Sequence, residues 1–142
     1  MKKAYLGLSI SNRTNLGQEI EVLKRCLAKH EIELCVFVDI YHFKAGQEHE
    51  MMAQAFREID QSDFLIVELT KKAIGVGVEV GYAHAKGKPV IYLKRKGAKY
   101  STTVGGCAKY MIDYEGEKHL GREMEKLMSL QSTVEGNKTT ED

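Results

Sequence analysis

The chain has 142 residues, of which 43% are apolar and 29% charged, a length and composition typical of one globular domain with its own core. No apolar run approaches the roughly 20 residues that a membrane-spanning helix needs, which argues against a membrane protein. Lys and Arg number 21 and Asp and Glu 20, so no large field of one sign favours binding to a nucleic acid polymer.

The cysteines and histidines argue against disulfides and bound metal. The cysteines are odd in number, lie far apart and form no C-x-x-C pair: Cys26, Cys35 and Cys107. The five histidines lack the spacing of metal ligands, and His49, with acidic neighbours, is typical of a solvated helix start. We therefore expect a cytoplasmic protein that needs neither a metal nor another cofactor.

The first half of the chain alternates strands and helices. Apolar periodicity predicts strand, helix, strand and helix in that order, over residues 3–10, 16–30, 32–40 and 47–61. The turn "SNRTN" separates the first two elements, and the spacing of Asn15 and Gln18 is compatible with a capping box. This places Ser9, Ser11 and Arg13 next to the unpaired N–H groups of a helix start.

The second half continues the alternation. The pattern predicts strand, helix, strand, weak strand and helix, over residues 63–69, 78–87, 88–95, 108–113 and 117–130. Gly87 ends the middle helix, and Pro89 falls at the start of a strand, where a missing N–H is tolerated. We expect a single domain over residues 1–130 and a mobile polar tail over residues 131–142.

Strands that alternate with helices throughout a chain indicate an α/β protein with a parallel sheet covered by helices on both faces. In such sheets ligands bind at the carboxyl ends of the strands, near the point where the strand order reverses. The rule selects four loops as site candidates, which contain "SISNRT", "DIYHFKAGQ", "TKKAIGVG" and "KGAKYSTTVGG". Glu79 lies just beyond the third loop.

Glu79 has two interpretations from the residues alone. An acid in the first turn of a helix is stabilised by the helix dipole, and the nearby glycines can serve only the turn and the close approach of helix to sheet. Alternatively, a carboxylate kept ionised by the helix N-terminus is a nucleophile for an electrophilic carbon. The "GVGVEVG" loop lacks the Lys of a phosphate-binding loop and contains an acid, so we do not expect a P-loop or a dinucleotide site.

Three segments resemble a known family. Residues 61–93, "QSDFLIVELTKKAIGVGVEVGYAHAKGKPVIYL", are similar to the core motif of the nucleoside 2-deoxyribosyltransferases and of the 2'-deoxynucleoside 5'-phosphate N-hydrolases. "YSTTVGGCAKYMIDYEG" is similar to the hydrolase branch, and "AYLGLSIS" to the first strand of both. The resemblance implies a three-layer, flavodoxin-like domain with a parallel sheet of about five strands, and cleavage of an N-glycosidic bond. It also implies that Glu79 attacks C1' of the sugar and that Tyr5 orients the attacking carboxylate.

The same resemblance implies a substrate-binding set and a homodimer. We expect the sugar and 5'-phosphate of a nucleotide to contact Ser9, Ser11, Arg13, Gly75, Gly77 and Ser101. Ser101 resembles a serine that reaches the phosphate from a neighbouring subunit, which implies at least a dimer. Without the resemblance, "STT" is an ordinary polar loop and Arg13 an ordinary surface charge.

Two positions depart from the family pattern. Ala55 stands where an acidic residue normally assists the departing base, and we consider Glu48, two turns back on the same helix face, as its substitute. Ala73 stands where the hydrolase branch has a serine near the phosphate. These departures leave three functions open: a nucleotide N-glycosidase, a base-exchanging transferase, and a non-catalytic nucleotide-binding module.

Overall fold

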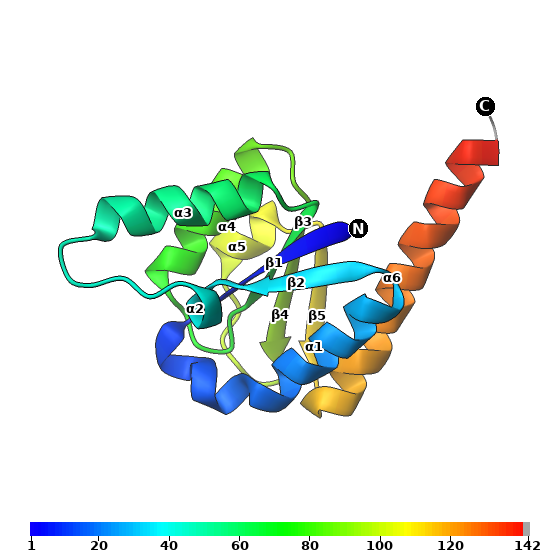
Figure 1. Cartoon of the computed structure of the whole chain (residues 1–142). Coiled ribbons are helices and arrows are strands. Elements are labelled where there is room, and N and C mark those ends of the chain that lie inside the picture. The colour runs from blue at the N-terminus through cyan, green and yellow to red at the C-terminus, as the bar shows by residue number, and fades with distance from the viewer. Residues whose placement is uncertain (141–142) are drawn as a thin grey trace.

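The computed structural model describes the backbone of residues 1–140 and side chains as far as Gln131. A five-stranded sheet with strand order β2-β1-β3-β4-β5 forms its centre (Figure 1). The strands are β1 Lys2–Leu8, β2 Ile32–Val36, β3 Phe64–Glu68, β4 Val90–Arg95 and β5 Tyr110–Tyr114. The helices are the 3₁₀ helix η1 Ile10–Leu16, and α1 Gly17–Lys29, α2 Phe37–Ile40, α3 Glu48–Asp60, α4 Ile74–Ala85, α5 Thr102–Cys107 and α6 Gly116–Thr140.

Every strand pairing is parallel, and β1 lies between β2 and β3. Leu6, for example, is in register with Val36 on one side and with Ile66 on the other. The strand order reverses between β1 and β3, so the loops after these two strands diverge at that point. The predicted α/β class and the flavodoxin-like arrangement of a parallel sheet are confirmed.

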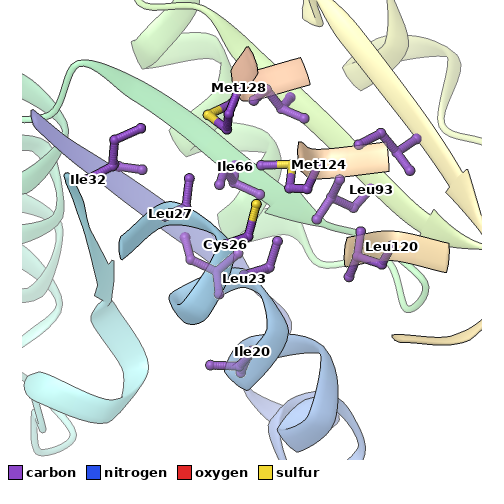
Figure 2. Packing of buried hydrophobic residues seen from close by; sticks show 14 of the residues in the cluster. Ile20, Leu23, Cys26, Leu27, Ile32, Ile66, Leu93, Leu120, Met124 and Met128 are labelled. Atoms are coloured by element: carbon purple, nitrogen blue, oxygen red, sulfur yellow. The ribbon is translucent and has the colours of Figure 1, made fainter. Parts of the chain in front are cut away.

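One face of the sheet is covered by α1 and α6, which pack against each other as well as against the strands (Figure 1). Figure 2 shows the core beneath them, where Leu23 and Leu27 of α1 meet Leu120 and Met124 of α6. A Cβ on Gly121 would lie 3.1 Å from Val22, so this glycine allows the close approach of the two helices.

The other face is covered by α3, α4 and α5. Its core contains the odd-numbered residues of β1 and β3, because side chains alternate along a strand. Tyr5 and Leu65 therefore point to this face, whereas Leu6 and Ile66 point to α1 and α6. The two faces of the sheet therefore have separate cores made of different residues.

The structure corrects three predicted elements in the first half. β2 ends at Val36 and not at residue 40, because residues 37–40 form α2, which has no buried residue and so lacks the covered faces of a central strand. The turn after β1 is the helix η1. The capping box is wrong, because α1 begins at Gly17 without a side-chain cap, and Asn15 bonds Asn12 instead.

The second half contains one helix more than predicted, because α5 lies within the expected fourth loop. α4 begins at Ile74, one turn earlier than expected, so Gly75 and Gly77 are helical rather than part of a loop. The burial of Val76 against the sheet outweighs the poor helix propensity of these glycines. Gly87, with φ of +73°, follows the helix as predicted.

Helix α6 continues along the chain to Thr140. The predicted mobile tail, residues 131–142, lies largely outside the described part of the chain, which ends at Gln131 for side chains and at residue 140 for the backbone. Among the described residues, no helix combines the length and the apolar character needed to cross a membrane.

Candidate active site

Glu79 and Tyr5 meet at the reversal of strand order. Tyr5 lies in β1 and Glu79 in α4, the helix that follows the neighbouring strand β3. The Tyr5 hydroxyl donates a hydrogen bond to Oε2 of Glu79, and the two residues are 1% and 9% exposed. The predicted catalytic pair is thus assembled from two segments far apart in the sequence.

Gly7 provides the space for this carboxylate. It lies two residues after Tyr5 on the same face of β1, and a Cβ placed on it would be 3.4 Å from Oε1 of Glu79 and 3.4 Å from Val67. Oε2 is held by Tyr5, so Oε1 lies over the bare backbone of Gly7. The sequence analysis missed Gly7, although a glycine inside a strand is a recognised sign of close approach.

The electrostatics of Glu79 differ from the prediction. Burial raises its pKa to about 7, and the hydrogen bond from Tyr5 only partly opposes this shift. α4 begins at Ile74, so Glu79 lies beyond the first turn, where the helix dipole has lost most of its effect. The expectation that the helix N-terminus keeps Glu79 ionised is therefore wrong, because desolvation determines its state.

A carboxyl group with a pKa of about 7 is present in both protonation states near neutrality. Its ionised form can attack an electrophilic carbon, and its protonated form can act as an acid. The pKa of Tyr5 is raised, first by burial and then by the charge of Glu79, so Tyr5 stays protonated and remains a hydrogen-bond donor. The pair can therefore present one oriented carboxylate oxygen to a ligand.

The candidates after β1 form a second group at the same edge of the sheet. Ser9 is buried, and its Oγ lies 3.0 Å from Oγ of the exposed Ser11. Arg13 makes two hydrogen bonds of 2.8 Å to the carboxylate of Asp39 in α2. Asp39 was not named as a site residue, although it is the first residue of the second candidate loop, "DIYHFKAGQ".

The remaining predicted residues lie in the first turn of α4 and at the start of α5. Gly75 and Gly77 are exposed in the first turn of α4, and a Cβ on either would meet nothing within 4 Å. Ser101 caps α5, where its Oγ accepts a hydrogen bond of 3.3 Å from Val104 N. Within the described part of the chain, no hydrogen bond links Ser101 to the residues after β1.

Ala55 is 2% exposed on α3, and the proposed substitute Glu48 is exposed at the first residue of that helix. The buried carboxylate of α3 is instead Glu58, which accepts hydrogen bonds from Lys3 and Tyr41. Burial alone would raise the pKa of Glu58, but these two donors outweigh burial and lower it. Glu58 is thus an ionised partner of Tyr41 rather than an acid.

Aromatic rings of the segment after β2 lie beside the Tyr5 and Glu79 pair. The Phe37 ring is 5.9 Å from that of Tyr5, and the Tyr41 ring is 5.0 Å from that of Phe37. Phe43 stacks on both Phe37 and Tyr41. Flat apolar rings next to a carboxylate suit a ligand that has a flat ring of its own.

The fold and this pair define a class: a flavodoxin-like α/β domain with a buried, tyrosine-bonded carboxylate at the point where the strand order reverses. The family model of the nucleoside 2-deoxyribosyltransferases matches residues 5–135, and the chain belongs to that family. The matched range includes Tyr5, Glu79 and Ser101.

A curated relative is the 5-hydroxymethyl-dUMP N-hydrolase of Branchiostoma floridae, which is 34% identical over 55 residues. The alignment covers 39% of this chain and 52%, about half, of that relative. Among solved structures, a CMP N-glycosidase of Clostridium botulinum has a TM-score of 0.67 at 21% identity, covering 89% of this chain and 99% of its own. A 2-deoxyribosyltransferase of Bacillus psychrosaccharolyticus has a TM-score of 0.63 at 12% identity, covering 87% and 90%. Both structures support the fold.

Proposed function

We propose that the protein is an N-glycosidase that cleaves the bond between base and sugar in a nucleoside 5'-monophosphate. The observation that carries the proposal is the buried pair of Tyr5 and Glu79 at the β1 and β3 switch point. The family membership and the N-hydrolase among the relatives support the reaction class.

The proposed reaction has two steps. Oε1 of ionised Glu79 attacks C1' of the sugar, the bond from C1' to the base nitrogen breaks, and its electron pair leaves with the base. Tyr5 keeps its proton and holds Oε2, which fixes the direction of attack. Water then attacks C1' of the glycosyl ester: its hydroxyl stays on C1', its proton passes through solvent to the departed base nitrogen, and the bond from C1' to Oε1 breaks, which releases the sugar phosphate and restores the carboxylate.

In this proposal the departing base receives no proton from Ala55 or Glu58 of α3. Ala55 cannot donate a proton, and ionised Glu58 binds Tyr41. General acid assistance contributes about a hundredfold to ten-thousandfold in other enzymes, so we expect slow cleavage unless the base leaves without it. The aromatic rings of Phe37 and Phe43 offer a stacking surface to the base.

We further propose that Ser9, Ser11 and Arg13 contact the 5'-phosphate and that Ser101 contributes from a second subunit of a homodimer. In support, Ile74 and Val78 are 90% and 47% exposed one turn apart on α4, beside exposed glycines. Such an apolar helix face is typical of a contact between subunits. Sedimentation equilibrium tests the dimer, and a monomer at micromolar concentration would contradict it.

The function is tested by incubating the protein with nucleotides and nucleosides and measuring free base by chromatography. Glu79→Gln should reduce release by at least about a thousandfold, since the nucleophile is lost. Glu48→Gln is the matched control, because Glu48 is an exposed carboxylate of α3, and its replacement should change the rate of base release by less than about twofold. A free acceptor base added to the mixture separates hydrolysis from transfer. Absence of base release by the folded protein would refute the proposal.

A further inference from the structure

The ion pair of Arg13 and Asp39 joins the helices η1 and α2, which follow β1 and β2 at the carboxyl edge of the sheet. Nε of Arg13 lies 2.8 Å from Oδ1 of Asp39, and Nη2 lies 2.8 Å from Oδ2. Two parallel N–H to O bonds of this kind are the geometry in which arginine binds either a carboxylate or a phosphate. The carboxylate therefore occupies the position on the guanidinium that a phosphate would take.

The pair is accessible and weakly held. The side chains of Arg13 and Asp39 are 29% and 35% exposed, and Asp39 belongs to α2, a four-residue helix without a buried residue. An ion pair with this exposure changes an equilibrium constant by at most about fivefold. A phosphate with nearly two negative charges can replace a single carboxylate at such a site.

The surroundings offer Asp39 other partners. Lys24 and His42 both act electrostatically on the Asp39 carboxylate, whereas Glu21 is the second acidic group near Arg13. A released Asp39 thus keeps cations close to it. α2 also contains Phe37, whose ring lies 5.9 Å from that of Tyr5, so an exchange at Asp39 takes place in the element that borders the proposed catalytic pair.

We infer that Asp39 is an internal competitor for the substrate phosphate: it occupies the Arg13 guanidinium in the free protein and is displaced when a nucleoside 5'-monophosphate binds. This inference rests on the proposed function, because it assigns a specificity role at the same site. A nucleoside without a phosphate leaves the ion pair intact. Asp39 thereby weakens the binding of nucleotides and not of nucleosides.

The test compares base release from the four 2'-deoxynucleoside 5'-monophosphates and from the matching nucleosides. Asp39→Asn should lower KM for nucleotides by about twofold to fivefold, the contribution of an exposed ion pair, with KM for nucleosides unchanged. Arg13→Gln should raise KM for nucleotides by about tenfold or more, because charge-assisted hydrogen bonds to the phosphate are lost. Arg13→Lys keeps the positive charge but removes the two parallel N–H donors of the guanidinium. It should therefore also reduce the preference for nucleotides.

Glu21→Gln is the matched control. Glu21 lies near Arg13, its side chain is 66% exposed, and its removal changes the net charge by the same amount without breaking the pair. If Glu21→Gln and Asp39→Asn lower KM equally, or if Asp39→Asn shifts nucleosides as much as nucleotides, the competition is refuted. Thermal melting checks that each variant remains folded.

The experiment also separates this inference from the proposed function. If no variant releases base, the glycosidase proposal fails, and dissociation constants measured by calorimetry with the same nucleotides and nucleosides take the place of KM. Tighter nucleotide binding by Asp39→Asn alone would then still support the competition. Failure of both ligand classes to bind would refute both.

Discussion

Two buried carboxylates lie on opposite faces of the sheet, and their surroundings differ. On the α1 and α6 face, Glu68 accepts hydrogen bonds from Thr70 N at 2.6 Å, from Thr70 Oγ1 at 2.7 Å and from the Tyr114 hydroxyl. On the α3 and α4 face, Glu79 accepts one hydrogen bond, from Tyr5, among the described residues. Both carboxylates are bonded to a tyrosine, yet only Glu68 has a full set of donors.

The difference separates a structural carboxylate from a reactive one. The network of Glu68 extends through Thr70 to the backbone N–H of Arg95, and Arg95 forms an ion pair with Glu19 of α1. This network joins β3, β4 and α1 and leaves no oxygen of Glu68 available. Oε1 of Glu79 lies over Gly7 and accepts no hydrogen bond from the part of the chain that the structure describes, and burial raises the pKa of Glu79 to about 7. An incompletely paired buried acid reduces stability and is typical of a functional site.

The largest effect should appear in the pH dependence of stability. The pKa of Glu79 is about 7 in the folded protein and 4.5 in its unperturbed state, so the folded protein binds more protons between these values. The free energy of unfolding contributed by this group is full below pH 4.5 and falls by about 3 kcal/mol as pH rises to 7. Glu79→Gln should remove this dependence and be more stable than the wild type at pH 8, as measured by urea denaturation at each pH. Parallel pH curves for the two proteins would contradict the raised pKa.

Glu68→Gln should have the opposite effect on stability. If the amide oxygen of Gln keeps the N–H of Thr70, the amide NH2 faces the hydroxyls of Thr70 and Tyr114, which donate to the carboxylate in the wild type and would have to give up that donation in order to accept. A buried group left without its partner costs about 1 to 3 kcal/mol, and we expect that loss at pH 8 in the same denaturation experiment. The base-releasing activity of the folded variant should stay within about threefold of the wild type. A Glu68→Gln variant as stable as the wild type would show that stability does not depend on the donors of Glu68, and that Glu68 and Glu79 do not differ in this respect.

Tyr5→Phe sharpens the comparison by removing the hydroxyl that donates a hydrogen bond to Glu79. The hydrogen bond from Tyr5 lowers the pKa of Glu79, so its loss should raise that pKa above 7. The rate of base release should then increase with pH over a more alkaline range, and fall by about tenfold at pH 6.5, since each pKa unit changes the ionised fraction by that factor. Tyr114→Phe is the control on the other face and should leave the pH profile in place. An equal loss at every pH would indicate that Tyr5 acts on the substrate instead.

The sequence predicted the parallel sheet and the pair of Tyr5 and Glu79, because both rest on local patterns: strand and helix periodicity for the sheet, and a contiguous family motif for Glu79. It did not predict the electrostatic state of Glu79. That state depends on where α4 begins. The helix begins one turn earlier than predicted because Val76 is buried against the sheet. Burial then mattered more than the helix dipole.

The segment after β2 was beyond sequence-based prediction for a similar reason. "FVDI" is as apolar as the strand before it, but only tertiary contacts show that it leaves the sheet as α2. The Asp39 and Arg13 ion pair joins segments whose proximity depends on this change of direction. Glu58 gave no signal in the sequence either, since its role follows from Lys3 and Tyr41, which are distant in the chain.

Gly7→Ala should have the smallest effect. It tests the space beside Oε1 of Glu79, where position 7 has no side chain. The added Cβ would be at ordinary contact distance, 3.4 Å, from Oε1 of Glu79 and from Val67, so the fold should be retained. The methyl group would displace solvent from Oε1, and desolvation disfavours the ionised form. We expect the pH profile of base release to shift to higher pH by up to about one unit. Gly81→Ala is the control, because a Cβ there meets nothing within 4 Å and the helix should gain about 0.5 to 1 kcal/mol. An unshifted profile in Gly7→Ala would mean that Oε1 is not solvated through this gap, and the absence of a side chain at position 7 would then serve the approach of the sugar.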